Sequence, residues 1–204
     1  YLDPQEPLKI AQATKELDLK HVVITSVDRD DLKDGGSTIW AETVNEIRRL
    51  NPETTLETLI PDFKGRKDDI QRIIDVAPEV VSHNMETVER LTKKVRIQAK
   101  YQRSLDTLRI LNEGGLRTKS GIMLGLGEED EEVIQTMKDL RSVGVSIMTI
   151  GQYLQPTTKH LPVIEYVHPD KFTKFKEIGL SLGFRVVESG PLVRSSYHAE
   201  KHLI

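Results

Sequence analysis

The chain has 204 residues, no cysteine and a formal net charge of −3, with 30% charged and 37% hydrophobic residues. This length suffices for one domain with a sizeable core, and we expect a single folding unit. The charge balance gives no general attraction to nucleic acid, and no apolar run approaches the roughly 20 residues that span a bilayer. Without cysteine, these residues form no disulfide, thiolate nucleophile or cysteine-ligated metal site.

Short β-branched apolar runs alternate with amphipathic segments along the whole chain. The apolar runs predict strands at 22–25, 54–60, 80–83, 117–124, 146–151 and 184–187. The amphipathic segments predict helices at 7–18, 39–49, 68–75, 86–91, 103–112, 130–141 and 169–182. Strands separated by helices are typical of right-handed βαβ units, so the pattern predicts an α/β fold with a parallel sheet.

Polar residues stand part-way along two of the predicted strands, among them Glu57, Lys119 and Ser120. In a flat sheet covered by helices on both faces, each polar group would need a buried partner or cost about 1–3 kcal/mol. The interior of a barrel that holds a ligand supplies a polar environment instead. The pattern therefore favours a barrel, or part of one, over a flat sheet.

The loop after the first predicted strand concentrates charge. It carries Arg29 and the pair Gly35-Gly36, together with the aspartates Asp28, Asp30, Asp31 and Asp34. Loops at the carboxyl ends of parallel strands usually carry the sites of α/β proteins. Three interpretations remain open: a functional loop, a divalent-metal site that lacks EF-hand spacing, and a solvated connection whose glycines only turn the chain.

Lys119 and a basic stretch permit more than one interpretation. Lys119 would form a Schiff base with a carbonyl substrate, as in a lyase or aldolase, if desolvation lowered its pKa. The alternative is a lysine neutralised by Glu57 or by a ligand carboxylate. Farther along the chain, Arg96, Lys100 and Arg103 form either a solvated face or a docking surface for an acidic partner.

Seven short motifs occur in a fixed order, at residues 25–36, 59–63, 83–88, 101–105, 119–128, 151–157 and 190–197. They include Ser-Val-Asp-Arg-Asp-Asp-Leu near the start, Lys-Ser-Gly-Ile-Met-Leu-Gly-Leu-Gly-Glu in the middle and Gly-Pro-Leu-Val-Arg-Ser-Ser-Tyr near the end. Together they resemble the lipoyl synthase family of radical S-adenosylmethionine (SAM) enzymes along nearly the whole chain.

This resemblance implies a partial (β/α)6 TIM-like barrel of the radical SAM type. Residues 1–204 would form one core domain, with 184–204 as a C-terminal extension that carries the Arg-Ser-Ser-Tyr motif. The implied reaction inserts sulfur at carbons 6 and 8 of an octanoyl-lysine on a lipoyl-carrier protein, either a lipoyl domain or a glycine-cleavage H-type protein. The implied location is the cytoplasm, or the mitochondrial matrix in a eukaryote.

The resemblance also implies cofactors. One 4Fe-4S cluster, reduced by an electron donor, cleaves SAM to a radical, and an auxiliary 4Fe-4S cluster donates the sulfur. Both cysteine motifs of the family are missing here, and in the family they lie upstream of the segment that residues 1–4 resemble. We therefore expect a chain that lacks the first strand and the cluster loops, holds neither cluster and is inactive alone, or serves only as a carrier-binding domain.

Individual residues receive roles from the resemblance. Ser196 would be the serine ligand of the auxiliary cluster, and Arg194 would steady the segment around it. Residues expected near SAM are Ser26, Gly35 and Gly36 at its amino acid moiety, Glu57, Asn84 and Lys119 at its polar groups, and Gly125, Gln152 and Gln155 around its adenosine. The basic residues Arg96, Lys100 and Arg103 would face the carrier protein.

Overall fold

The computed structural model describes residues 2–203. One parallel sheet organises these residues, and its strands lie side by side in the order of the sequence. The strands are β1 (His21–Thr25), β2 (Thr55–Leu59), β3 (Val80–Ser82), β4 (Thr118–Leu124), β5 (Ile147–Gln152) and β6 (Val186–Ser189). Each crossover carries at least one helix, so the sheet is a succession of βαβ units, and the predicted α/β parallel fold is confirmed.

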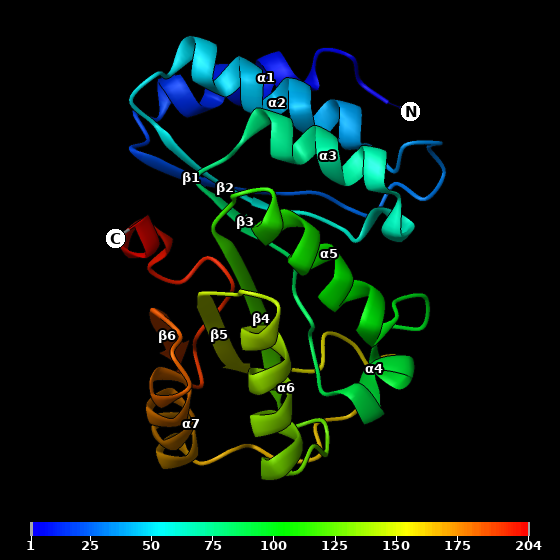
Figure 1. The fold of residues 1–204 in the computed structure, drawn as a ribbon, viewed down its shortest axis with the longest axis vertical. Helices are drawn as coiled ribbons and strands as arrows, with labels where there is room; N and C mark the ends of the chain where they lie inside the picture. Colours follow the sequence, from blue (N-terminus) through cyan, green and yellow to red (C-terminus); the bar gives the residue numbers. More distant parts are fainter. Residues whose placement is uncertain (1, 204) are drawn as a thin grey trace.

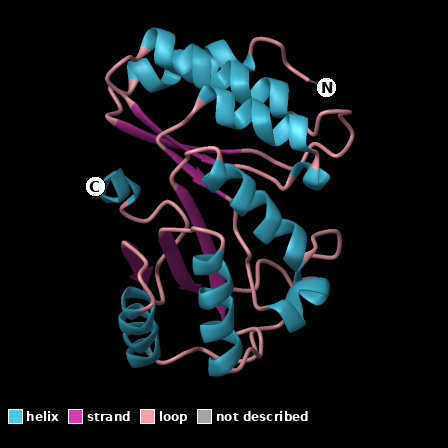
Figure 2. Cartoon of the chain, in the orientation of Figure 1, coloured by secondary structure: helices cyan, strands magenta, loops and turns pink. Residues whose placement is uncertain are grey.

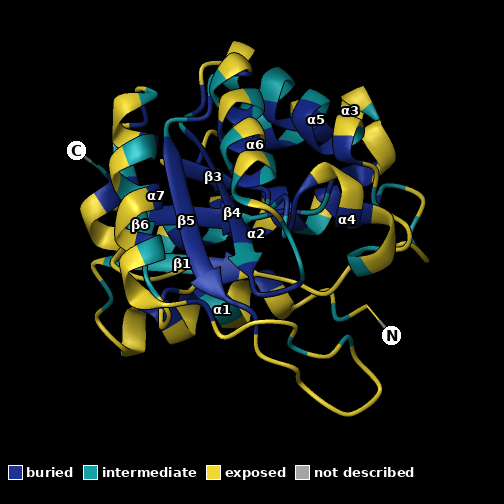
Figure 3. Cartoon of the chain, turned by 90° about the horizontal axis from the view of Figure 1, so that it is seen from below, coloured by how far each residue is buried: buried dark blue, intermediate teal, exposed yellow. Residues whose placement is uncertain are grey.

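The helices cover one face of the curved sheet, as Figures 1 and 2 show. They are α1 (Glu6–Glu16), α2 (Ser37–Leu50), α3 (Lys67–Val76), α4 (Glu89–Val95), α5 (Tyr101–Glu113), α6 (Asp130–Ser142) and α7 (Pro169–Ser181), with the short 3₁₀ helices η1 (Phe63–Gly65) and η2 (Ala199–Leu203). The central strands are mostly buried, the edge strands β1 and β6 are partly exposed, and the helices expose their outward faces (Figure 3). The C-terminal helix η2 contacts β1, and Figure 1 shows it away from α5, on the inner side of the curve.

Several predicted boundaries differ from the structure, and two of the differences have an identifiable cause. The helix predicted at 86–91 begins only at Glu89, because Glu86 still pairs with Ile122 beside β4. The last strand, predicted from residue 184, begins at Val186, because the N–H of Phe184 donates to the carbonyl of Gly179 and completes the end of α7. Hydrophobic periodicity reveals neither effect, since the first depends on a bridge to a distant segment and the second on backbone hydrogen bonds at the end of a helix.

The apolar core has two parts, joined by α5. The cluster beneath α1 to α3 includes Ile47, Leu56 and Ile70, and the cluster beneath α4 to α7 includes Met137, Ile150 and Phe175. From α5, Leu108 packs into the second cluster and Leu111 into the first, both 0% exposed. One helix therefore holds the two halves of the sheet together through residues less than one turn apart.

We predict that Leu108→Ala and Leu111→Ala each lower the free energy of unfolding by about 2–5 kcal/mol, because each leaves a cavity in a packed core. Urea denaturation followed by circular dichroism measures the change. Leu180→Ala, at a position 46% exposed on α7, is the control and is expected to change stability by less than about 0.5 kcal/mol. Equal effects at all three positions would contradict the role of α5.

Candidate functional site

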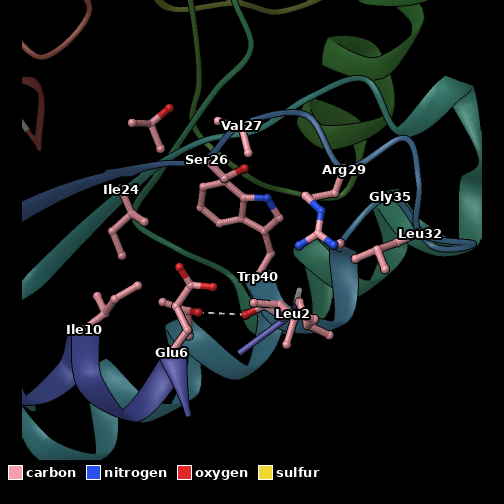
Figure 4. A pocket seen from close by; sticks show the side chains of 14 residues that line it. Leu2, Glu6, Ile10, Ile24, Ser26, Val27, Arg29, Leu32, Gly35 and Trp40 are labelled. Carbon is pink, nitrogen blue, oxygen red and sulfur yellow. Dashed lines mark hydrogen bonds between the residues drawn. The ribbon is translucent and has the colours of Figure 1, made fainter. Parts of the chain in front are cut away.

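The glycine pair and neighbouring residues of the charged loop line a pocket at the carboxyl end of β1. Its volume is about 390 Å³, and Ser26, Gly35 and Gly36 all contribute to its wall. Arg29 and Trp40 extend into the same space from the loop and from α2 (Figure 4). The loop thus forms one side of a concave site, as a functional loop at a strand end would.

Asp34 shapes the turn at the glycine pair. Its carboxylate accepts hydrogen bonds from the N–H groups of Gly36 and Thr38, both 3.0 Å away, and so caps the start of α2. Partial burial opposes ionisation, but hydrogen bonds from Thr38 and Gly36 lower the pKa of Asp34 to about 2. Asp34 therefore orders this turn of the loop.

The glycine pair has conformational and steric reasons to be glycine. Gly35 and Gly36 have φ values of +61° and +85°, which residues with a side chain rarely adopt. A Cβ on Gly35 would also lie 2.9 Å from Nη2 of Arg66 and 3.2 Å from Cδ1 of Phe63. Arg66 is held in turn by Asp69, a buried residue at the start of α3. The turn is therefore fixed from behind by packing.

Two of the other aspartates of the loop pair with basic side chains. Asp31 forms two hydrogen bonds with Arg29, at 2.8 and 2.7 Å, and Asp30 lies 3.3 Å from the ammonium of Lys64. Within residues 2–203, no group of three or more His, Cys, Asp or Glu side chains is placed to hold a metal ion. The divalent-metal interpretation of this loop therefore gains no support.

A second polar group lies on the inner face of the sheet. Residues two apart on a strand share a face, and the register places Gly121 of β4 beside Thr149 of β5. A Cβ on Gly121 would lie 2.4 Å from Oγ1 of Thr149 and 3.2 Å from Oδ1 of Asn84. That Asn84 oxygen is buried without a hydrogen-bond partner among the described residues. Asn84, Gly121 and Thr149 hence surround an unsatisfied acceptor, a place for a ligand donor.

Two sequence motifs meet to position Asn84. His83 is buried, with Nδ1 2.9 Å from the carbonyl of Ile60 and Nε2 2.8 Å from Oγ of Ser104. Desolvation lowers the pKa of His83 to about 4, so the ring is neutral at pH 7. Arg96 donates to the backbone carbonyl of Asn84 at 3.0 Å and to Ser104 at 3.3 Å. The motifs at 83–88 and 101–105 are therefore one hydrogen-bonded unit.

Directly beneath this group lies a buried ion pair between Lys119 and Glu57. Nζ of Lys119 is 2.7 and 3.0 Å from the two carboxylate oxygens of Glu57, and both side chains are 0% exposed. Burial lowers the pKa of Lys119 against the opposing charge of Glu57. For Glu57, burial raises the pKa, while the surrounding hydrogen bonds and positive charge lower it overall.

The predicted neutralisation of Lys119 by Glu57 is confirmed. A Schiff-base lysine needs an accessible, neutral amine, and Lys119 is enclosed and charge-paired. The lyase or aldolase interpretation therefore has no structural support. Both side chains are covered by protein atoms. A direct contact of Glu57 or Lys119 with SAM stays a prediction.

Gln152 and Gly125, two residues expected near the adenosine of SAM, form hydrogen bonds that hold a long loop in place. The side chain of Gln152 donates to the carbonyls of Tyr153 and Glu165, at 2.9 and 3.0 Å, and accepts from the N–H of Val167 at 2.9 Å. The carbonyl of Gly125 accepts from the N–H of Ile164 at 2.8 Å. These contacts hold residues 153–168 at the mouth of the sheet. Gln155 is exposed within that loop and donates to the carbonyl of His160.

The other predicted site residues lie apart. Arg194 and Ser196 are exposed on the turn that precedes η2. Of the basic residues assigned to the carrier, Arg103 is engaged with Asp62 at 2.6 Å, and Arg96 with Asn84 and Ser104, whereas Lys100 is exposed. The basic stretch is therefore not simply a solvated face.

Sequence reasoning missed three residues of the inner face. Thr149 carries no motif, and only its register with Gly121 reveals it. Glu86 belongs to a quoted motif but received no role; its φ of +65° is unusual, and burial raises its pKa. His202 lies 3.2 Å from Nζ of Lys119, a contact across 83 residues of sequence that no local pattern predicts.

Comparisons with known proteins agree with this architecture. A family model described as the radical SAM superfamily matches residues 1–140. A lipoyl synthase of Christiangramia forsetii is 68% identical over 203 residues, which cover 99% of this chain and 69% of the relative. The mitochondrial lipoyl synthase of Nematostella vectensis is also 68% identical over 203 residues, 99% of this chain and 70% of the relative. The chain belongs to the lipoyl synthase family.

Solved structures share the fold of this lipoyl synthase family member at low identity. Methylornithine synthase superposes with a TM-score of 0.67 and 12% identity, covering 95% of this chain and 64% of the other. SuiB of Streptococcus suis, solved with bound SAM, superposes with a TM-score of 0.62 and 12% identity over 98% of this chain and 42% of the other. The predicted partial barrel of the radical SAM type is thereby confirmed as the fold.

Family membership implies 4Fe-4S clusters and SAM as cofactors. The residues present do not fit a cluster, because the sequence contains no cysteine and thiolate is the usual iron–sulfur ligand. They do fit SAM, since the orphaned oxygen of Asn84 and the pocket at Gly35-Gly36 offer polar groups at the strand ends. Within residues 2–203, each helix is too short or too polar to cross a bilayer.

We predict that the capping of α2 by Asp34 depends on pH. The folded-state pKa of about 2 lies below the ordinary 3.8, so the stabilisation is fully present above about pH 4 and is lost as the pH falls toward 2. Asp34→Ala should lower the free energy of unfolding by about 1 kcal/mol at neutral pH, and this difference should shrink between pH 4 and 2. Urea titrations at several pH values test it.

Asp28→Ala, at an exposed aspartate of the same loop, is the control and should change stability little at any pH. A loss for Asp34→Ala that stays constant down to pH 2 would show that the ionised carboxylate is not its source.

Proposed function

We propose that this chain carries out the SAM-binding part of lipoyl synthesis, in which sulfur is inserted into a protein-bound octanoyl chain. The identity of 68% to lipoyl synthases over 203 residues is the observation that carries the proposal. When bound, SAM supplies the radical that abstracts hydrogen from the octanoyl chain. The residues of this chain bind and orient that cofactor. The cysteine ligands of the clusters would have to come from residues that this sequence does not contain.

SAM would lie along the carboxyl ends of β1 to β5. Ser26 and the Gly35-Gly36 turn would contact its amino acid moiety, because close backbone approach suits a small zwitterion. Asn84 follows β3, about 10 Å from β1 at ordinary strand spacing, so one elongated ligand reaches both. The orphaned Oδ1 of Asn84 would then accept a hydrogen bond from an N–H or O–H of SAM. Gly121 keeps that space open.

The latched loop 153–168 would close the mouth beside the ligand. The side chain of Gln152 and the carbonyl of Gly125 bind backbone groups of this loop. Their role near the adenosine would be to position the loop rather than to contact the adenine base. Leu154, Ile164 and Tyr166 of this loop are exposed, and an acyl chain carried on a protein needs apolar contacts near the site. Of the three basic residues assigned to the carrier, Lys100 is the exposed one and would meet an acidic carrier.

A chimaera tests the proposed function directly. This chain would replace the matching 203 residues of the Christiangramia forsetii relative, which retains the rest of its own sequence. We expect the chimaera to convert an octanoylated lipoyl domain into the lipoylated form, measured by mass spectrometry as the gain of two sulfur atoms. A folded, cluster-loaded chimaera that cleaves no SAM and transfers no sulfur would overturn the proposal.

A second prediction addresses the binding residues. In the chimaera, Asn84→Ala should weaken SAM binding about tenfold, because one hydrogen bond to a polar ligand is worth about 1.4 kcal/mol. Gly121→Ala should weaken it at least as much, since its Cβ would collide with Thr149. Isothermal titration calorimetry measures both. Asn45→Ala, an exposed asparagine on α2, is the matched control and should bind SAM unchanged. Unchanged SAM affinity in both site variants would show that SAM does not bind at Asn84 and Gly121.

A further inference from the structure

The hydrogen bonding of the Lys119 ammonium is completed by His202, from the far end of the chain. A lysine ammonium has three N–H donors and no acceptor. Two of them point to the carboxylate of Glu57, at 2.7 and 3.0 Å, and the third lies 3.2 Å from Nδ1 of His202. All three side chains are 0% exposed. The buried charge is therefore fully hydrogen-bonded only while His202 is in place.

His202 acts here as an acceptor. Its Nδ1 is 3.2 Å from the lysine Nζ but 4.0 Å from the nearer Glu57 oxygen, so the lysine is its partner. Accepting at Nδ1 requires a neutral ring. The carboxylate of Glu57 is also served by Ser82, whose Oγ donates to it at 2.9 Å. Strands β2, β3 and β4 thus each contribute to a charge centre that η2 closes.

The C-terminal segment, defined as residues 190–203, runs along the inner face of the sheet between two anchors. At one end, a Cβ on Gly151 would lie only 2.2 Å from the carbonyl oxygen of Val193. The absence of a side chain at Gly151 therefore leaves room for the segment at the carboxyl end of β5. At the other end His202 reaches Lys119, and Nη1 of Arg117 donates to the His202 carbonyl at 3.0 Å. Figure 1 shows this segment in red.

The Arg-Ser-Ser-Tyr motif lies between these anchors. Val193 and Ala199 are buried, whereas Arg194, Ser196 and Tyr197 are exposed. The motif is therefore a short exposed turn tied down on both sides. Its first anchor, at Gly151, stands two residues from Thr149 on the same face of β5, next to the proposed SAM site.

We propose that His202 is a positioning residue: by accepting the third N–H of the buried Lys119 ammonium, it docks the C-terminal segment and fixes the Arg194–Tyr197 turn beside the inner face. Undocking leaves a buried donor of a charged group without a partner, so the segment and the Glu57–Lys119 pair stabilise each other. The relevance of the turn to sulfur insertion rests on the proposed function, but the docking itself does not.

Hydrogen exchange of the chain tests this without SAM. In His202→Leu, the backbone amides of residues 190–203 should exchange at least about tenfold faster, the factor that corresponds to about 1.4 kcal/mol of lost docking. His202→Asn should restore much of the protection, because its amide oxygen takes the position of Nδ1. Lys201→Ala, at the exposed neighbour, is the control and should leave exchange unchanged. Peptide-resolved mass spectrometry provides the readout.

A double-mutant cycle separates the proposed cause from simple packing. With Glu57→Gln and Lys119→Met the buried charges are gone, and adding His202→Leu should then change exchange by less than about twofold. A full effect in that background, or unchanged protection in His202→Leu alone, would overturn the proposal. So would loss of protection in α5 together with the segment, because that would make His202 a determinant of the whole fold. Failure of SAM binding, by contrast, concerns only the proposed function.

Discussion

The ion pair of Glu57 and Lys119 is the constraint on which the interior depends. Two full charges lie within a sheet whose other face is covered by helices, and their desolvation is offset only when every donor and acceptor has a partner. Ser82 and His202 supply the missing partners from β3 and from η2. The register of three strands and the path of the C-terminal segment are thereby tied to one buried charge centre.

The inner face is layered by chemistry. Next to the charged layer, about 7 Å along β4, comes the layer of Asn84, Gly121 and Thr149, which contains an acceptor without a partner. In the first layer the Lys119 ammonium has a partner for each of its donors, whereas in the second the Oδ1 of Asn84 has none. This contrast fits the proposal that a ligand contacts only the second of the two polar layers.

Two loops frame the open layer by different means. The Gly35-Gly36 turn is set by left-handed backbone angles, the Asp34 carboxylate and packing against Arg66. The loop at residues 153–168 is set by one side chain, Gln152, which binds backbone groups on both of its ends. In each case a single polar side chain satisfies main-chain groups that a loop would otherwise leave to water. A residue expected from the sequence to contact a ligand, such as Gln152, can therefore instead hold the loop in position.

The sequence by itself determined the kinds and order of the elements, the parallel sheet, the polar interior and, through seven motifs, the family, because periodicity and motifs are local properties of the chain. It also offered Glu57 as one possible neutralising partner of Lys119, and the structure selected it. Only the tertiary structure decided that His202 completes that pair, that Thr149 faces Asn84 and that Gln152 latches a loop. These contacts join residues far apart in sequence, and hydrogen-bond geometry between distant segments leaves no trace in local spacing.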